Sequence, residues 1–403
     1  MEAEINTGVK GAEPTRGKTK LFDFLKEAPH IVALSKDDDA EVLQFFDQAG
    51  MSGGGFRLLM QRKPRFFDLF EHRGGISRAV GLRDDNGRLV GSGALTSTPC
   101  FIDGKPGNFV YLADLRVQDR DPALVREWRE WFGKVMKAAP QLEEGGENGH
   151  MVCGIIETND RARRVLEERV HNGQKLLRIA PYAMVTMLAR RPSWFGLRKK
   201  KTEFVCERGG TVQELESFLD SVHREQAFGQ CFGAPHFELR RRLQTWKGFS
   251  IEDFFAVRDS RGKIVATTAL WNPNQCKQTV VEGPAWTKGF NFIAGKLAWP
   301  KFGEPLEIIY LTHMAFAWHL SLDEKREILA LMMEMIWPEK KRRKAHAIAF
   351  CDFKESSLKP ALQSFIKADV DVGMYLVLPE TEVKSFDPAS LGRFPPAFEM
   401  ALV

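Results

Sequence analysis

Apolar and polar positions along the chain set out the same order of elements twice. In residues 79–97 (AVGLRDDNGRLVGSGALTS) two apolar runs flank a short polar segment with a glycine, and residues 254–272 (FFAVRDSRGKIVATTALWN) repeat this arrangement. The two segments align without a gap, with Gly87 opposite Gly262. Because glycine permits the positive φ of a tight turn, each segment is predicted to form a β-hairpin.

A second repeated pair follows the hairpins. Residues 111–117 (YLADLRV) and 310–316 (YLTHMAF) are mostly apolar and are predicted to be strands. Each runs into a segment, 122–138 or 323–336, whose apolar residues recur with the period of an α-helix. This period is typical of an amphipathic helix that packs one face against a sheet.

A third repeated pair completes each half. Short apolar runs predict strands at residues 151–157 and 347–353, helices near 160–170 and 356–367, and final strands at 182–188 and 373–378. Each half is therefore predicted to contain a hairpin, a strand, a helix, a strand, a helix and a last strand, which is an α/β arrangement.

The length agrees with two such units, because 403 residues exceed what one ordinary core accommodates. A stretch of Pro, Gly and basic residues separates the halves and is typical of a linker. We predict a flexible tail at 1–20, a domain at 21–190, a basic linker at 191–202 and a second domain at 203–403.

Composition narrows the classes of protein. No run of about 18 apolar residues is present, so no membrane association is expected. The six cysteines are scattered without a C-x-x-C motif, which favours the reducing cytoplasm and predicts neither a zinc site nor another metal. The net charge is +5, and much of the excess lies in basic runs at 198–201 and 340–344. These runs either bind phosphates or nucleic acid or are simply solvated segments. Neither run is interleaved with aromatic residues, so a nucleic-acid partner is not expected.

The residues after the hairpin carry a family resemblance. The strand YLADLRV and the later helix with Asn159 and Ala162 in an N-x-x-A pattern resemble the GNAT superfamily of acyl-CoA-dependent N-acyltransferases. The resemblance extends over both halves through the repeat and is stronger in the first. It implies two tandem GNAT-like domains, each a mixed central sheet flanked by helices with a splayed fourth and fifth strand.

The resemblance also implies a co-substrate, acetyl-CoA or another acyl-CoA. In the family, the pantetheine arm lies between the splayed strands and the pyrophosphate lies at the start of the next helix, where partial positive charge and free N–H groups favour an anion. Carried over to this chain, the cofactor-binding residues are Leu115, Arg116, Val117, Arg120, Asn159 and Arg163.

The pyrophosphate loop departs from the family pattern in both halves. Residues 117–124 (VQDRDPAL) lack the glycines of the family loop, and Asp119 and Asp121 bring negative charge to it. In the second half, Ser321 and Glu324 form the pattern of a capping box, which satisfies the helix N-terminus internally. We therefore expect the chemistry in the first half and a second half that does not bind CoA in the family manner.

Two polar residues inside apolar strands are the catalytic candidates. Asp114 is a predicted base or acceptor-binding carboxylate, or else the partner of a salt bridge with Arg116 or Arg83, because a buried carboxylate needs compensation. His313 occupies the equivalent position in the second half and is a predicted proton shuttle, or else a core histidine bonded to the backbone.

Two further features of the first half bear on a site. Leu166 stands where the family often has the tyrosine that protonates the leaving thiolate, so that role is vacant in the sequence. Phe66, Phe67 and Phe70 form either a hydrophobic substrate pocket or part of the core.

Three functions are compatible with these observations. The first is an N-acyltransferase that moves an acyl group, for example acetyl, to the amine of a small molecule or peptide. The second is a non-catalytic binding or scaffold protein whose CoA site is lost. The third is an aminoacyl-tRNA-dependent transferase, a class that resembles paired GNAT folds and is supported here only by the basic runs.

Overall fold

The computed structural model describes residues 20–48, 51–53, 56–118, 121–138, 149–191, 203–283 and 301–402. The predicted tail lies outside the described residues except for Lys20, and so do Arg120, Asp119 and the linker beyond Arg191. Within the described ranges, no helix has both the length and the apolar character needed to cross a bilayer.

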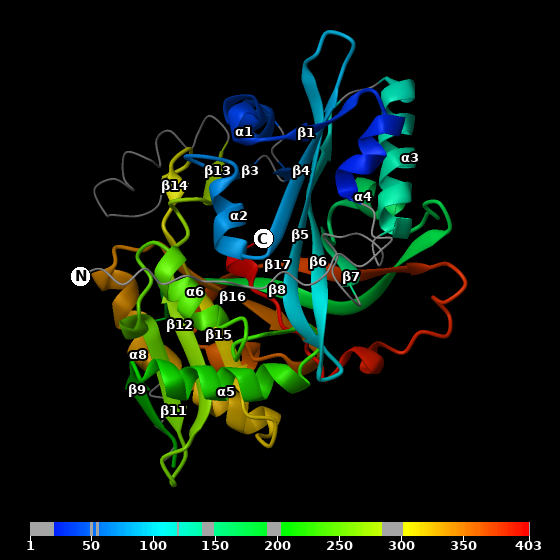
Figure 1. The fold of residues 1–403 in the computed structure, drawn as a ribbon. Helices are drawn as coiled ribbons and strands as arrows, with labels where there is room; N and C mark the ends of the chain where they lie inside the picture. The colour runs from blue at the N-terminus through cyan, green and yellow to red at the C-terminus, as the bar shows by residue number, and fades with distance from the viewer. Residues whose placement is uncertain are drawn as a thin grey trace, which may run out of the picture.

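One sheet of 13 described strands runs through both halves of the molecule (Figure 1). Its order is β1-β4-β5-β6-β7-β17-β8-β16-β15-β12-β11-β9, and β10 pairs with β5. The first half supplies β1 (Ile31–Leu34), β4 (Ile76–Arg83), β5 (Leu89–Ile102), β6 (Lys105–Val117), β7 (Gly149–Ile156) and β8 (Gln174–Arg190). The second half supplies β9 (Val205–Arg208), β10 (Gly229–Gln230), β11 (Phe254–Arg258), β12 (Ile264–Trp271), β15 (Ile308–Phe316), β16 (Ala347–Phe353) and β17 (Phe365–Pro379).

A smaller sheet also joins the halves. Its order is β14-β13-β3-β2, made of β14 (Pro305–Leu306), β13 (Gln278–Glu282), β3 (Phe56–Gln61) and β2 (Met51–Gly53). Strand β13 of the second half pairs antiparallel with β3 of the first half. The two halves are therefore connected through two sheets.

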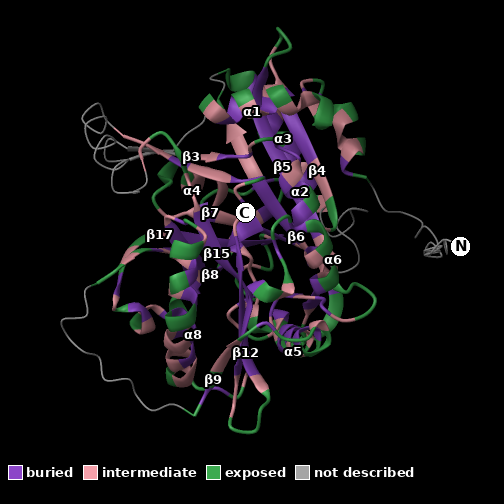
Figure 2. Ribbon diagram, turned by 90° about the vertical axis from the view of Figure 1, so that its left-hand side faces the viewer, coloured by how far each residue is buried: buried purple, intermediate pink, exposed green. Residues whose placement is uncertain are grey.

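Helices cover both faces of the large sheet. The described α-helices are α1 (Asp39–Gln48), α2 (Asp68–Arg73), α3 (Pro122–Ala138), α4 (Asp160–Leu166), α5 (Val212–Glu225), α6 (Glu238–Thr245) and α8 (Leu322–Arg342). In the second half, α8 lies on one face of the strands and α5 lies on the opposite face, as the two ribbon views agree (Figures 1 and 2). In the first half, α1 and α2 lie on the other side of β4–β6 from α3 (Figure 1).

The two predicted hairpins are confirmed, and they match in detail. Gly87 and Gly262 both adopt a φ of 76° in the turn. In the first turn, Arg83 donates to the carbonyl oxygen of Gly87 at 2.7 Å, and in the second, Arg258 donates to that of Gly262 at 2.9 Å. The repeat therefore extends from the sequence to side-chain contacts.

The last strand of each half is built into the sheet of the other. Strand β17 lies between β7 and β8 and is antiparallel to both. Strand β8 pairs in turn with β16 of the second half. The β8–β17 ladder extends from Phe365 opposite Arg190 to Pro379 opposite Gln174, so these two strands form the joint of the molecule.

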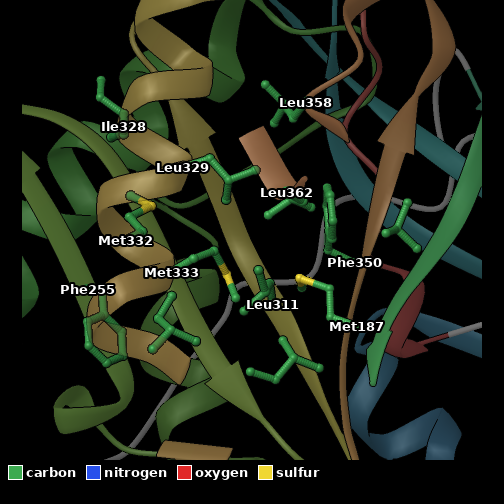
Figure 3. Close-up of a cluster of buried hydrophobic side chains, with 14 of the residues drawn as sticks. Met187, Phe255, Leu311, Ile328, Leu329, Met332, Met333, Phe350, Leu358 and Leu362 are labelled. Carbon is green, nitrogen blue, oxygen red and sulfur yellow. The ribbon is translucent and has the colours of Figure 1, made fainter. Parts of the chain in front are cut away.

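Side chains of the two exchanged strands, β8 and β17, also pack into the core of the other half. Ala183, Val185 and Met187 of β8 belong to the core beneath α8, and Figure 3 shows Met187 among the side chains of that helix and of β15 and β16. Tyr375 and Val377 of β17 belong to the core beneath α3. Because buried apolar area is the main source of stability, each half depends on the last strand of the other.

The predicted helix at 356–367 is wrong. Two short 3-10 turns, η5 (Lys354–Ser356) and η6 (Lys359–Leu362), take its place, and β17 begins at Phe365. The Asp352 carboxylate accepts hydrogen bonds from the Ser357 hydroxyl and the Leu358 N–H, which hold the chain in a turn. The following residues then pair with β8, a long-range partner that local periodicity does not reveal.

Other expected boundaries change by several residues. Helix α4 ends at Leu166, and α8 continues to Arg342, so part of the second basic run is its last turn. The final strands are longer than predicted, since β8 begins at Gln174 and β17 at Phe365.

Candidate active site

Each half contains a pair of parallel strands that separate. Strand β6 pairs with β7 only as far as Leu112 opposite Cys153. Strand β15 pairs with β16 only as far as Tyr310 opposite Ala349. Beyond these points the strands continue without pairing each other, so the backbone of 113–117 in β6 faces an opening. The predicted splay is present in both halves.

A β-bulge marks the point where each pair separates. The β5–β6 register shifts between Ser92 and Ala94, where Asp114 adopts a φ of 56°. The β12–β15 register shifts between Thr267 and Ala269, where His313 adopts a φ of 50°. Because a bulge bends its strand and redirects side chains, the repeat places the two polar residues at equivalent bends.

A pocket of about 510 Å³ opens beside the separated end of β6. Helices α3 and α4 form its other walls. Four residues predicted to bind cofactor line it: Leu115, Arg116, Val117 and Asn159. Arg163 does not line it, and Arg120 lies outside the described residues.

The side chains of three predicted cofactor residues have structural partners. The Asn159 carboxamide oxygen accepts the Ala162 N–H at 3.0 Å and caps α4. The Arg116 guanidinium lies over the ring of Phe46, 4.2 Å from its centroid. Arg163 pairs with Glu167 at 3.1 Å. Asn159 and Arg116 are therefore held at the pocket wall by defined contacts, and Arg163 is paired outside the pocket lining.

Two arginines that the sequence motifs did not indicate line the same pocket. Arg129 on α3 and Arg161 on α4 are exposed and make no hydrogen bond or ion pair within the described ranges. A sequence signal exists for Arg129, which shares the helical face of Val125 and Phe132 at spacings of i+4 and i−3. The pocket therefore offers two available cations.

The corresponding pocket of the second half is smaller, at about 120 Å³. Residues 395–400 from the end of the described chain line it, beside Met314 and Phe316 of β15. The predicted capping box of α8 is confirmed, because Ser321 Oγ accepts the Glu324 N–H at 3.3 Å and Glu324 accepts the Ser321 N–H at 2.7 Å. This helix start is satisfied by its own side chains.

Asp114 lies in a buried cluster of charges. Its Oδ1 is 2.9 Å from Arg62 Nη2, its Oδ2 is 3.9 Å from Arg73 Nη2, and its side chain is 5% exposed. Burial would raise the pKa of Asp114, but the guanidinium groups of Arg62 and Arg73 hold it below the ordinary value. Of the two expected partners, Arg116 also helps to lower this pKa, whereas Arg83 pairs instead with Asp38 and Glu41. Asp114 is therefore an ionised carboxylate between two arginines.

His313 lies in a separate buried cluster. Its Nε2 is 3.1 Å from Arg242 Nη1 and its Nδ1 is 2.9 Å from Thr312 Oγ1. Burial, and then the charge of Arg242, lower the pKa of His313 well below the ordinary value. The ring packs against Phe249 with the two planes at 10°. The structure therefore places a neutral histidine here and does not bring it together with Asp114.

The three phenylalanines before the hairpin are part of a core. Phe66 packs on Phe46 of α1 with ring centroids 5.0 Å apart, and it contacts Phe67 and Phe70 edge to face. All three are buried in one apolar cluster. They line neither the pocket beside β6 nor the corresponding pocket of the second half.

Two tyrosine hydroxyls meet where β6 and β7 separate. Gly154 follows the last paired residue of β7, and a Cβ atom there would lie 3.2 Å from the hydroxyl oxygens of both Tyr111 and Tyr182. Leu166, which lacks a polar group, lines the pocket on the α4 side. The two hydroxyls beside Gly154 therefore come from β6 and β8.

Neither a protein-family model nor a curated protein matches the chain. Among solved structures, it is similar to Saccharomyces cerevisiae N-myristoyltransferase with bound myristoyl-CoA and inhibitors, with a TM-score of 0.54 and 12% identity over 86% of this chain and 80% of that one. It is also similar to a GCN5-related glucosamine N-acetyltransferase region in a fungal multi-domain GH3 β-N-acetylglucosaminidase, with a TM-score of 0.55 and 15% identity over 86% of this chain and 38% of that one. At these identities the likeness shows the fold, and the chain has the GNAT fold, as the sequence predicted.

Proposed function

We propose that the protein is an acyl-CoA-dependent N-acyltransferase whose co-substrate binds in the first half. The observation that carries the proposal is the pocket beside β6, where unpaired strand backbone and two available arginines face one opening. The solved structures of similar fold include an enzyme with bound myristoyl-CoA, which supports a CoA thioester as co-substrate.

Two kinds of contact would hold the cofactor in this pocket: backbone hydrogen bonds to the pantetheine arm and ionic contacts to the phosphates. The backbone of residues 115–117 is positioned to bind the amides of the pantetheine arm, as the resemblance implies. The first turn of α3 is less suited to phosphate, because the Asp121 carboxylate already accepts the Ala123 N–H at 2.7 Å. We therefore assign the phosphate charges to Arg129 and Arg161, which bind phosphate through charge-assisted hydrogen bonds.

The proposed reaction transfers the acyl group to a primary amine. The amine arrives as an ammonium ion, since its pKa is about 10.4 in a lysine-like group, and loses one proton before attack. Its lone pair bonds to the thioester carbonyl carbon, the C–S bond breaks, and that electron pair stays on sulfur. The nitrogen loses a second proton as the amide forms, the thiolate gains one proton, and one proton is released to solvent.

The Tyr111 and Tyr182 hydroxyls are our candidates for hydrogen bonding to the departing sulfur. They converge at Gly154, where a thioester at the inner end of the slot would lie. Burial raises the pKa of both phenols, so both stay protonated and able to donate at neutral pH. This arrangement fills the role that Leu166 leaves vacant.

The cofactor assignment is tested by charge reversal at the two arginines. We expect Arg129→Glu and Arg161→Glu each to weaken acetyl-CoA binding about tenfold, the loss of one charge-assisted hydrogen bond worth about 1.5 kcal/mol. The loss should shrink as ionic strength rises, because salt screens exposed charges. Isothermal titration calorimetry with a series of acyl-CoAs measures the affinity and the preferred chain length.

Matched controls lie on the same two helices. Arg126 of α3 and Arg164 of α4 are also exposed, but neither lines the pocket. Arg126→Glu and Arg164→Glu should leave the affinity within about twofold, as surface substitutions usually do. Equal losses in all four variants would mean a nonspecific charge effect and would contradict the assignment. Tight acyl-CoA binding without acyl transfer to any amine would favour the non-catalytic alternative.

A further inference from the structure

A second pocket, of about 310 Å³, lies between the two halves. The first half contributes residues of α2, β5 and β6, and the second half contributes residues of β10 and α6, residues 397–399 and Leu402. Tyr111 lines this pocket, and its hydroxyl is one of the two that meet at Gly154. The pocket therefore adjoins the point where β6 and β7 separate.

Aromatic rings form one wall of this pocket. Phe109 stacks on Tyr111 with ring centroids 6.0 Å apart and packs against Phe228 at 5.1 Å. Phe398 contacts Tyr111 at 5.9 Å from the second half. All four line the pocket, so its wall is apolar and rich in π faces.

Glu399 places a carboxylate in the same pocket. Its side chain is 10% exposed. Oε1 accepts the His313 N–H at 2.9 Å and a hydrogen bond from Arg242 Nη1 at 3.3 Å. Oε2 has no hydrogen-bond partner within the described part of the chain. The carboxylate is thus anchored by one oxygen, and the other is available to a ligand.

The other carboxylate of the pocket is already engaged, and Arg73 is engaged in part, because its Nη2 has no hydrogen-bond partner within the described residues. Glu238 accepts from Arg241 and from Arg242, each at 2.7 Å. Arg73 donates to the Leu402 carbonyl oxygen at 2.6 Å and lies beside Asp114. Among the described residues of the pocket, Glu399 is therefore the carboxylate with an available oxygen.

We propose that this pocket binds the amine acceptor, and that the acceptor is a small primary amine with an aromatic or similarly apolar body whose ammonium group binds Glu399. The proposal rests on the proposed function, which requires an amine beside the thioester. It places the amine between a carboxylate and aromatic faces, and both attract a cation. The apolar body then lies against Phe109 and Phe228.

The same features argue against other acceptors. A polyamine would leave its further ammonium groups without a carboxylate, because Glu399 Oε2 is the available carboxylate oxygen among the described residues of the pocket. An uncharged analogue, such as the alcohol of the same shape, would not form the ion pair with Glu399 and should bind more weakly. The volume of about 310 Å³ suits a molecule smaller than a typical drug.

The test uses the full-length protein and three probes. 2-Phenylethylamine, 2-phenylethanol and spermidine are titrated by calorimetry, with and without saturating acetyl-CoA. We expect the amine to bind at least about tenfold more tightly than the alcohol or spermidine, the value of one charge-assisted contact. Equal binding of amine and alcohol would overturn the proposal.

Variants of Glu399 separate its charge from its packing. Glu399→Gln should reduce 2-phenylethylamine affinity about tenfold and leave 2-phenylethanol affinity unchanged, because the amide keeps the shape and loses the charge. If the glutamine variant folds poorly, Glu399→Asp provides a second test. It keeps the charge and should therefore retain part of the affinity for 2-phenylethylamine. Unchanged amine affinity in a folded glutamine variant would overturn the proposal. Acetyl-CoA affinity should stay unchanged in both variants. Its measurement therefore distinguishes a loss of the acceptor site from a loss of the cofactor site.

The pH dependence gives an independent readout. Burial raises the pKa of Glu399, and Glu238 adds to this effect, while Arg242 and the His313 N–H oppose it. Cys351 is the other titratable group that senses Glu399, and it stays protonated because burial raises its pKa. Amine affinity should therefore fall as the pH drops through the raised pKa of Glu399, and Glu399→Gln should abolish that fall. The same pH profile in both proteins would contradict the role of Glu399.

Discussion

Replacement of Asp114 by asparagine is expected to lower the free energy of unfolding by about 3–5 kcal/mol, the range for breaking a buried ion pair from one side. The carboxylate lies between Arg62 and Arg73, and all three side chains are about 95% buried. Lys277 is also buried nearby, and burial together with both arginines lowers its pKa well below the ordinary value. Removal of this carboxylate takes away the negative charge that faces Arg62 and Arg73.

The choice of asparagine isolates the charge. Asp114 has a φ of 56°, and asparagine tolerates this left-handed conformation as aspartate does. Asp114→Ala should therefore lose about 1 kcal/mol more, because it adds backbone strain to the lost charge. The double variant Asp114→Asn/Arg62→Gln should recover part of the loss, because it also removes one of the two cations that face this carboxylate.

Urea denaturation measures these differences. A loss under about 1 kcal/mol for Asp114→Asn would mean that the cluster is solvated or already neutral, contrary to its burial. The kcat of the folded Asp114→Asn variant also tests whether Asp114 acts as a catalytic base. An ionised carboxylate with a lowered pKa is a weak base, so we expect the larger effect on stability and a smaller one on kcat.

The two halves are expected to fold only together. When residues 1–191 and 203–403 are expressed as separate chains, each should give no cooperative unfolding transition. The first chain would lack β17, which pairs with both β7 and β8. The second would lack β8, whose Val185 and Met187 belong to the core beneath α8. Each chain would expose a long unpaired strand edge and an incomplete core, which favour aggregation.

Co-expression is the matched control for the split. The two chains should then co-purify in equal amounts, with a circular dichroism spectrum and thermal transition close to those of the intact protein. A single half that is monomeric and unfolds cooperatively would contradict this expectation. It would instead support the independent domains at 21–190 and 203–403 that the sequence predicts.

The local periodicity of the chain determined most elements of the fold. Glycines at the turns, alternating strands and the apolar faces of α3 and α8 were readable because each signal lies within about twenty residues. The repeat also placed Asp114 and His313 at equivalent positions, and both proved to be bulge residues with positive φ. The assignment of Leu115 to Val117 to the separated strand end was implied by the family resemblance of that strand and not by periodicity.

Only the tertiary structure decided which distant residues meet. Arg62 lies 52 residues before Asp114, and Arg242 lies 157 residues before Glu399, so no local pattern connects either pair. The exchange of β8 and β17 and the pocket between the halves likewise depend on pairing across the whole chain. Periodicity indicates which face of a helix or strand is buried. The partner of a buried charge depends instead on how elements that are distant in sequence pack against each other.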